Sequence, residues 1–287
     1  MFCWEIIYSW APYFTFRLRT VHNSIFLFII IVAAKTKDTP EYDFTTEDDI
    51  RHQMWVVNEE ATVAKIEKTF AEEVEYIYVA DGHHRTAAAS LVGKERKEQN
   101  PNHTGDEEYN FFLSVNFPAS QLTIIDYNRV VKDLNGLSNE EFIEKIKTSF
   151  DIEKIGTNEY KPTKLHEFSM YLDHNWYKLT AKNTTYNESD PVGVLDVTIL
   201  TEQVLAPHLD IKDLRRSERI EFVGGIRGLG ELKKRVDSGE MKAAFALFPV
   251  SMEQLMNIAD NDMIMPPKVT WFEPKLRSGL IVHSLLD

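Results

Sequence analysis

The sequence predicts an α+β fold with mixed, largely antiparallel sheets and packed helices. Runs of β-branched and aromatic residues alternate with helical patterns, but without a strict βα period. Short turn sequences join several of these runs, and short connections favour antiparallel pairing. Hydrophobic residues make up 43% of the 287 positions, which is enough for a packed core.

Residues 1–40 are atypical, and we expect the fold to occupy residues 41–287. An apolar run at 25–34 follows Arg17 and Arg19, but it is too short to span a bilayer. A signal peptide is an alternative, although the region before the run is long and aromatic. A start from rearranged or misassigned coding sequence is the preferred explanation.

The first elements of the expected fold surround a turn at Gly82. Residues 51–57 suit a strand, and the spacing of Val63, Ile66 and Phe70 predicts a helix that ends near Glu73. Residues 75–79 suit a buried strand, and the Ala- and Leu-rich residues 86–91 suit a helix packed closely on a sheet.

The middle of the chain predicts a solvated loop, strands and a capped helix. Residues 94–105 are charged and are expected to be a solvated helix end and loop. Residues 109–117 and 122–131 are predicted to be adjacent antiparallel strands. Ser138 and Glu141 form a capping box, and the helix that follows is expected to bury Phe142, Ile143, Ile146 and Phe150.

The remaining patterns predict further strands and helices. A hairpin is expected around Asp173-His174-Asn175, and a helix from Pro191 that stops near Pro207. Ser251 and Gln254 form a second capping box. The other expected elements are strands at 219–223, 242–248, 269–272 and 279–285, and a helix at 228–236 closed by Gly239. Residues 156–164 are the best candidate for a domain boundary within the expected fold.

Composition excludes several classes of function. A formal charge of −13 argues against broad binding of nucleic acids or anionic membranes, which needs a positive surface. The single cysteine, Cys3, excludes an intrachain disulfide framework and a structural zinc site built on cysteines, which fits a cytoplasmic protein. Residue 86 is Thr where a protein-kinase catalytic loop would have its aspartate, and no Walker loop is present. The sequence indicates no oligomeric state.

The segment Asp81-Gly82-His83-His84-Arg85 is the strongest candidate site. A helix that opens after Gly82 would present unpaired N–H groups to an anion, and Arg85 would add a bidentate phosphate contact. The alternative is a structural turn in which Asp81 caps the helix and Arg85 forms an ion pair. Adjacent histidines rarely point the same way, so we assign no metal ligands to them.

This segment resembles the phosphate-binding element of the ParB/sulfiredoxin superfamily, to which the free serine kinases belong. Residues 43–287 also resemble the domain-of-unknown-function 1015 family, and the segments that carry this second resemblance are 105–108, 128–131, 222–228 and 265–275. Members of that family are longer at the N-terminus, with Pro-Tyr-Asp and His-Glu-x-Thr stretches. This chain is therefore expected to be a C-terminal portion.

The resemblance implies a phosphotransferase that uses ATP or ADP with Mg²⁺ and acts on a small hydroxylated metabolite. The residues expected to be catalytic are Asp81, His83 and His84; those expected to bind the nucleotide are Gly82, His84, Arg85, Thr86 and Lys268. A non-catalytic nucleotide-binding or interaction module and a metal-dependent phosphohydrolase remain alternatives. The serine kinases take a catalytic carboxylate from a segment before this motif, so we expect this chain to turn over little substrate.

Two further segments have open interpretations. Residues 222–228 place three glycines and an arginine at a strand-to-helix junction, which indicates either a second phosphate-binding turn or a tight turn that needs positive φ. Residues 266–277 contain Lys268, Lys275 and Arg277 beside an aromatic run. They could cover a nucleotide or line a small-molecule pocket, and the alternative is a proline-bounded edge strand with solvated cations.

Overall fold

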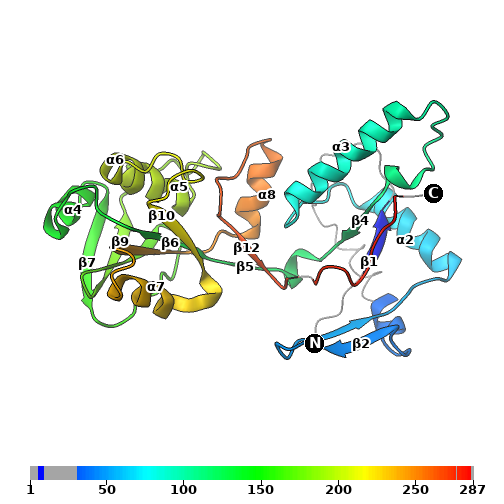
Figure 1. Cartoon of the computed structure of the whole chain (residues 1–287), viewed down its shortest axis with the longest axis horizontal. Coiled ribbons are helices and arrows are strands. Elements are labelled where there is room, and N and C mark those ends of the chain that lie inside the picture. The colour runs from blue at the N-terminus through cyan, green and yellow to red at the C-terminus, as the bar shows by residue number, and fades with distance from the viewer. Residues whose placement is uncertain (1–5, 10–30, 276, 286–287) are drawn as a thin grey trace. The chain divides into compact units, whose positions relative to one another are not determined.

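The computed structural model describes residues 6–9, 31–275 and 277–285 (Figure 1). The chain divides into two compact units. Unit 1 comprises Met1–Leu122 and Lys275–Asp287, and unit 2 comprises Thr123–Pro274. The predicted boundary at 156–164 lies inside unit 2, so the chain divides at other positions. The chain enters unit 2 once and leaves it once.

A six-stranded antiparallel sheet forms the centre of unit 2, in the order β10-β6-β11-β8-β9-β7. Its strands are β6 (Tyr127–Val131), β7 (Phe150–Gly156), β8 (Glu167–Leu172), β9 (Asn175–Ala181), β10 (Ile220–Gly224) and β11 (Ala243–Leu247). This antiparallel sheet with its packed helices confirms the predicted α+β class.

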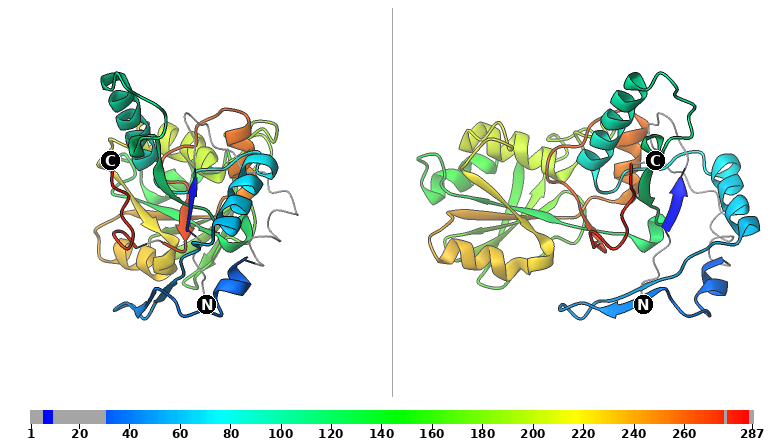
Figure 2. Two further views of the ribbon diagram at one scale, coloured as in Figure 1. Left: turned by 90° about the vertical axis from the view of Figure 1, so that its right-hand side faces the viewer. Right: turned by 45° about the vertical axis from the view of Figure 1, so that its right-hand side comes forward.

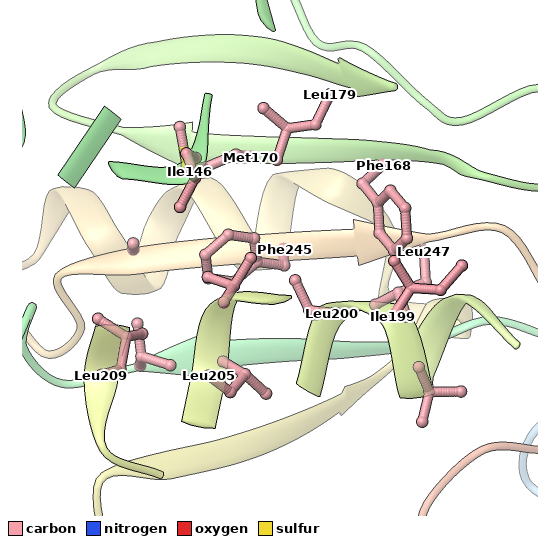
Figure 3. Packing of buried hydrophobic residues seen from close by; sticks show 14 of the residues in the cluster. Ile146, Phe168, Met170, Leu179, Ile199, Leu200, Leu205, Leu209, Phe245 and Leu247 are labelled. Carbon is pink, nitrogen blue, oxygen red and sulfur yellow. The ribbon is translucent and has the colours of Figure 1, made fainter. Parts of the chain in front are cut away.

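Helices cover both faces of this sheet (Figures 1 and 2). The helices of unit 2 are α4 (Asn139–Ile146), α5 (Asp196–Leu200), α6 (Ala206–Leu209), α7 (Gly228–Asp237) and α8 (Met252–Asp260). One apolar cluster takes side chains from α4, α5, α6 and α8, and a second packs under α7. In Figure 3, Ile199, Leu200, Leu205 and Leu209 of the α5–α6 segment lie over Phe245 and Leu247 of β11. Alternation along the strands thus supplies a core on each face.

The two predicted capping boxes are confirmed. At the start of α4, the Glu141 N–H donates to Ser138 Oγ and the Ser138 N–H donates to Glu141 Oε2. Ser251 and Gln254 form the same pair at the start of α8. The prediction that Phe150 belongs to the first helix is wrong, because α4 ends at Ile146 and Phe150 begins β7. The Phe150 side chain is buried whether it ends a helix or begins a strand, so apolar periodicity alone does not distinguish the two.

The hairpin of β8 and β9 is confirmed. Leu172 pairs with Asn175, and the two residues between them, Asp173 and His174, have φ of 50° and 59°. Positive φ at both positions is typical of a type I′ turn, whose twist matches that of the flanking strands. Short polar residues such as Asp tolerate this conformation better than most others do. The strands at β10 and β11 and the helix α7 also lie where the sequence predicts them.

The helix expected from Pro191 to Pro207 begins and ends later than predicted. It starts at Asp196 and continues through a π-helical turn, Thr201–Leu205, into α6, which contains Pro207. The Ala206 N–H donates to Thr201 O, five residues back. Proline cannot donate to the carbonyl four residues before it, and a π turn shifts the bonding pattern at that point. Pro207 is therefore accommodated rather than helix-ending.

The second predicted strand of the middle region, 122–131, is two strands. β5 (Thr123–Ile125) pairs with β12 (Trp271–Glu273), whereas β6 after Asp126 joins the large sheet. β4 (Phe112–Val115) pairs instead with β1 (Ile6–Ser9) in unit 1. The predicted adjacency of 109–117 and 122–131 is therefore wrong. Thr123 lies opposite Glu273, so the two ends of unit 2 are hydrogen-bonded neighbours.

Unit 1 contains shorter sheets and two longer helices. Its strands and longer helices are β1, β4, β2 (Tyr42–Thr45), β3 (Arg51–Met54), α2 (Glu60–Glu73) and α3 (His83–Gln99). Residues 31–35 are also helical, and 3-10 turns lie at Glu108–Asn110 and Ala119–Gln121. The predicted strand at 51–57 and the helix ending near Glu73 are confirmed. Because β1 pairs with β4, the expectation that residues 1–40 stay outside the fold is wrong for Ile6–Ser9. It is also wrong for residues 35–38, because Lys35 pairs with Glu59 and Trp55 Nε1 donates to Asp38 O. Residues 1–5 and 10–30 lie outside the described part of the chain, and they include most of the apolar run.

Two predicted strands of unit 1 do not form. Residues 75–79 and 279–285 form no strand. β-branched and aromatic composition indicates a fit to a pleated, half-buried surface, but a strand also needs a neighbour to pair with. The expected close packing of the next helix is wrong as well, because α3 buries none of its residues.

Candidate functional site

The candidate site lies where α3 begins. Gly82 is the N-cap of this 17-residue helix and has φ of 86°, a conformation that favours glycine. The Thr86 N–H donates to Gly82 O at 2.9 Å, which closes the first turn. The N–H groups before it have no helical carbonyl to bind, and glycine supplies no side-chain cap. The predicted turn is confirmed, and the N-cap is Gly82 rather than Asp81.

Asp81 lies between two donors. Its Oδ1 accepts the Gly82 N–H at 2.8 Å, and Lys275 Nζ lies 3.3 Å from its Oδ2. Partial burial acts to raise the pKa of Asp81, but the Gly82 hydrogen bond and the charges of Lys275 and Arg85 outweigh it. The pKa of Asp81 therefore lies below its usual range, and the carboxylate is ionised at neutral pH.

Arg85 turns back over Gly82. A Cβ at Gly82 would lie 3.4 Å from Arg85 Nη2, so the guanidinium covers the turn. Arg85 is exposed, and within the described part of the chain it forms no ion pair. The alternative of a structural ion pair at Arg85 is therefore not supported. A cation held at the start of a helix and open to solvent is suited to meet an anion.

His83 and His84 occupy the first turn of α3, and both are exposed. Neighbouring residues on a helix point about 100° apart, so the two rings face different directions, as the sequence indicates. Thr86 is half-buried and uses its N–H within the helix, which leaves its hydroxyl as the group that could reach a ligand.

Lys268 belongs to unit 2, whereas the turn belongs to unit 1. Lys268 has φ of 57°, and its carbonyl accepts from Arg129 Nη2 at 2.9 Å. Its ammonium lies 5.8 Å from the centre of the Tyr127 ring. These contacts place Lys268 beside Arg129 and Tyr127 of β6.

Arg129 is fully buried in unit 2 without a carboxylate partner among the described residues. Its Nη1 donates to Tyr127 O, its Nε is buried without a partner, and its guanidinium lies 5.3 Å from the centre of the Phe222 ring. Burial lowers the pKa of Arg129 to about 10. Because Arg129 also donates to Lys268 O, it fixes the loop that carries Pro266 and Pro267. The segment 128–131, which carries part of the family resemblance, therefore contains a buried arginine with a structural role.

The glycines at 222–228 mostly reflect close packing. A Cβ at Gly225 would lie 2.4 Å from the carboxyl carbon of Asp126, and one at Gly224 would lie 2.7 Å from the Trp271 ring. Gly228 has φ of 71°, which agrees with the tight-turn interpretation for that residue. Asp126 itself accepts from Asn128 Nδ2 at 2.6 Å. The junction therefore brings β6, β10 and β12 together and does not present an open turn.

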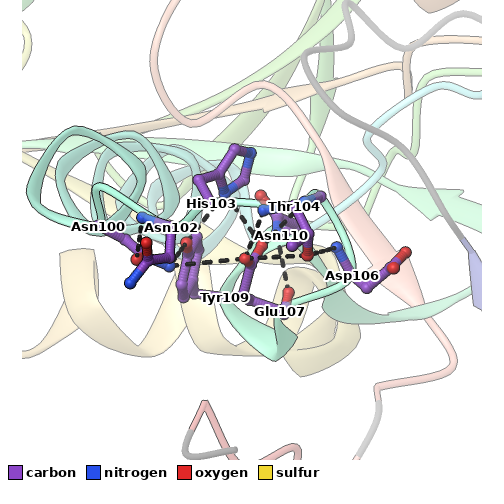
Figure 4. Close-up of polar contacts among 9 residues, drawn as sticks. Asn100, Asn102, His103, Thr104, Asp106, Glu107, Tyr109 and Asn110 are labelled. Carbon is purple, nitrogen blue, oxygen red and sulfur yellow. Dashed lines mark hydrogen bonds and ion pairs between the residues drawn. The ribbon is translucent and has the colours of Figure 1, made fainter.

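Glu107 organises the loop between α3 and β4 (Figure 4). Its carboxylate accepts the Thr104 N–H at 2.6 Å, the Gly105 N–H at 3.0 Å and Asn110 Nδ2 at 3.0 Å, and His103 Nδ1 lies 2.9 Å away. Burial acts to raise the pKa of Glu107, but these donors lower it to about 2. The segment 105–108, which also carries the family resemblance, is therefore part of a loop that the Glu107 carboxylate holds in place.

The described residues contain no group of three or more His, Cys, Asp or Glu side chains that could hold a metal ion. In the same part of the chain, none of the helices combines the length and apolar character needed to cross a bilayer.

Lys275 is a cation of the 266–277 segment, and nothing in its sequence position links it to the turn at Gly82. It lies 194 positions from Asp81, and no spacing rule connects residues so far apart. The only sequence feature that marks Lys275 is its place directly after Pro274, and this feature does not indicate a contact with Asp81.

The fold and the turn define a class: an α+β protein of two units, with a glycine-opened helix that carries an exposed arginine. A family model described as "Protein of unknown function (DUF1015)" matches residues 23–198, and the chain belongs to this family. The match begins before residue 43, where the sequence resemblance was expected to start. It ends before the segments at 222–228 and 265–275.

No curated protein matches the sequence. Among solved structures, a conserved hypothetical protein from Pyrococcus furiosus is similar at 16% identity and a TM-score of 0.36, over 69% of this chain and 70% of that one. A free serine kinase in complex with AMP is similar at 12% identity and a TM-score of 0.36, over 94% and 90%. A mutant free serine kinase in complex with ADP gives 14% identity and a TM-score of 0.36, over the same shares.

Proposed function

We propose that the turn at Asp81 to Thr86 binds the phosphates of ATP or ADP and that the chain is a phosphotransferase acting on a small hydroxylated metabolite. The observation that carries the proposal is the arginine at this turn. Arg85 covers Gly82 at the start of α3, open to solvent and without an ion pair among the described residues. Phosphate groups bind where helix N–H groups and an arginine converge.

Each residue of the turn has a proposed role. Gly82 has no side chain, so the backbone can approach a phosphate oxygen, and Arg85 neutralises its charge. His83 or His84 donates a hydrogen bond to a phosphate oxygen, and the Thr86 hydroxyl can add another. Asp81 orients the acceptor hydroxyl or a metal-bound water through its ionised carboxylate. Lys268 was expected to contact the nucleotide, and that role stays a proposal.

Mg²⁺ fits the residues of the turn as a nucleotide-bound ion. In phosphoryl transfer it is held by one or two protein carboxylates together with the phosphates, which it bridges and neutralises. Asp81 is the carboxylate that this turn offers, but its oxygens already face the Gly82 N–H and Lys275, so the ion would be held mainly through the phosphates. The single cysteine, Cys3, fits a reducing compartment such as the cytoplasm, and small hydroxylated metabolites and nucleotides occur there.

Calorimetric titration with ATP and ADP, each with and without Mg²⁺, tests nucleotide binding. We expect the wild-type chain to bind and Arg85→Ala to lose binding while its thermal unfolding stays unchanged. Lys94→Met is a matched control, because Lys94 is an exposed cation of the same helix. Unchanged nucleotide affinity in Arg85→Ala, with a lowered unfolding temperature, would show that Arg85 is structural.

Transfer of a labelled γ-phosphate to a mixture of small hydroxylated metabolites then separates the alternatives. Transfer supports the phosphotransferase, and binding without transfer or hydrolysis supports the nucleotide-binding module. Release of phosphate without an acceptor supports the phosphohydrolase.

A further inference from the structure

The last described segment of the chain returns to unit 1 and is held there by polar contacts to several elements. Arg277 pairs with Asp48 in the β2–β3 turn. His283 Nε2 lies 2.7 Å from Glu108 Oε2, and Arg96 Nη1 of α3 donates to Leu285 O at 2.7 Å. Residues 277–285 form no strand or helix, so these contacts fix their path.

Lys275 is the first residue of unit 1 after unit 2, and its side chain reaches the candidate site. Its ammonium lies 3.3 Å from Asp81 Oδ2, while the other carboxylate oxygen is occupied by the Gly82 N–H. Both carboxylate oxygens of Asp81 are therefore held. The carboxylate sits beside the turn at which the proposed phosphate would bind, and an uncompensated negative charge there would repel it.

We propose that Lys275 is a positioning residue, which holds and neutralises the Asp81 carboxylate so that a phosphate can approach the Gly82–Arg85 turn. The inference rests on the proposed function and adds to it a residue from the far end of the sequence. Lys275 acts through Asp81 and not by contact with the phosphate. Its effect on nucleotide affinity should therefore depend on the presence of a carboxylate at position 81.

A double-mutant cycle on ADP affinity tests this dependence. The cycle compares the wild-type chain, Lys275→Met, Asp81→Asn and the double variant, by calorimetry with ADP and without Mg²⁺, so that loss of a metal ligand does not enter. We expect Lys275→Met to weaken ADP binding about two- to fivefold, the range for an exposed ion pair. Asp81→Asn should bind at least as well as wild type, and the double variant should match Asp81→Asn.

Two controls keep the result specific. Lys275→Arg restores the charge and should bind ADP as the wild type does. Lys94→Met removes an exposed lysine that pairs with Glu98 within α3, at 4.0 Å, and should leave ADP affinity unchanged. If Lys275→Met does not fold, Lys275→Gln takes its place in the cycle.

Three outcomes would overturn the inference, and they are distinguishable. No ADP binding by the wild-type chain, either with or without Mg²⁺, removes the proposed function and the inference with it. ADP binding that Lys275→Met leaves unchanged removes the inference alone. An equal loss from Lys275→Met in the Asp81→Asn background shows that Lys275 contacts the phosphate itself, which also contradicts the positioning role.

Discussion

The two units are stabilised by different means. Unit 2 buries an apolar core on both faces of its sheet, with side chains such as Phe245 and Trp176 fully inaccessible. In the described part of unit 1, the buried hydrophobic residues are Met54, Ile66 and Tyr109, and α3 buries none. Unit 1 relies instead on polar anchors such as Glu107. The candidate site therefore lies in the unit where packing constrains side chains least.

The largest expected effect comes from removing a core side chain of unit 2. Phe245 of β11 pairs with Arg129 of β6 and Met170 of β8. Its side chain is fully buried in the apolar cluster drawn in Figure 3. We expect Phe245→Ala to lower the free energy of unfolding of unit 2 by about 3–5 kcal/mol, because it removes apolar contacts and leaves a cavity. Urea denaturation followed by circular dichroism measures this change.

Leu91→Ala is the matched change in unit 1. Leu91 is 68% exposed on α3, so we expect a change within about 0.5 kcal/mol. A loss comparable to that of Phe245→Ala would mean that α3 is packed against something in solution, and the contrast between the units would fail.

A buried carboxyl group gives unit 2 a pH dependence. Asp196 accepts the His166 N–H at 2.9 Å, and its Oδ2 is buried without a partner among the described residues. Burial raises the pKa of Asp196 to about 7, above the usual value near 3.8 that applies in the unfolded chain. The folded state thus binds the proton more tightly, so the stabilisation is complete below about pH 4 and is lost as the pH rises to about 7.

Asp196→Asn should remove this pH dependence. Asparagine resembles the neutral acid, so between pH 4 and 8 the wild type should lose about 2–4 kcal/mol of unfolding free energy relative to the variant. Denaturation curves of both proteins at several pH values measure the difference. Parallel pH profiles would show that Asp196 is ionised in the folded protein.

Gly82→Val should have a smaller effect on stability and a clear one on binding. Valine is strained at φ of 86°, which costs about 1–2 kcal/mol, and its branched side chain would crowd Arg85. We expect thermal unfolding of unit 1 to shift slightly and nucleotide affinity to fall sharply in calorimetry. Wild-type affinity in this variant would exclude backbone approach of the phosphate at Gly82.

The smallest effect is local to the loop held by Glu107. Its pKa of about 2 lies below the usual value near 4.5, so its stabilisation is present above that value and is lost as the pH falls towards 2. We expect Glu107→Gln to speed amide hydrogen exchange at residues 104 and 105 at pH 7 while exchange in unit 2 stays unchanged. Faster exchange in unit 2 as well would show that this loop supports both units.

The elements that the sequence predicts best are those with local signals. The capping boxes at Ser138 and Ser251 and the hairpin at Asp173 depend on residues within a few positions of each other. The sequence predicts strands at 75–79 and 279–285 from composition, but pairing depends on distant segments, and none of the described segments pairs with them. The pairing of β1 with β4 and of β5 with β12 could not be predicted for the same reason.

The sequence predicts the turn of the candidate site at Gly82, but it does not predict which distant residues lie beside that turn. Glycine before a helical pattern predicts the turn at Gly82, and the structure has it there. The position of Lys275 beside Asp81 depends on how the chain returns from unit 2, which no local pattern encodes. The nucleotide-binding and catalytic roles of the turn stay predictions.

Because unit 2 is inserted within unit 1, the order of synthesis matters for folding. Its first and last strands, β5 and β12, pair with each other, so unit 2 closes on itself once Glu273 has left the ribosome. At about 5–20 residues per second, roughly eight to thirty seconds separate the synthesis of Leu122 from that of Lys275. Throughout that interval the nascent chain carries Asp81 without its lysine. Unit 1 is therefore expected to be the last part of the protein to mature, and the nascent site stays incomplete until the final residues emerge.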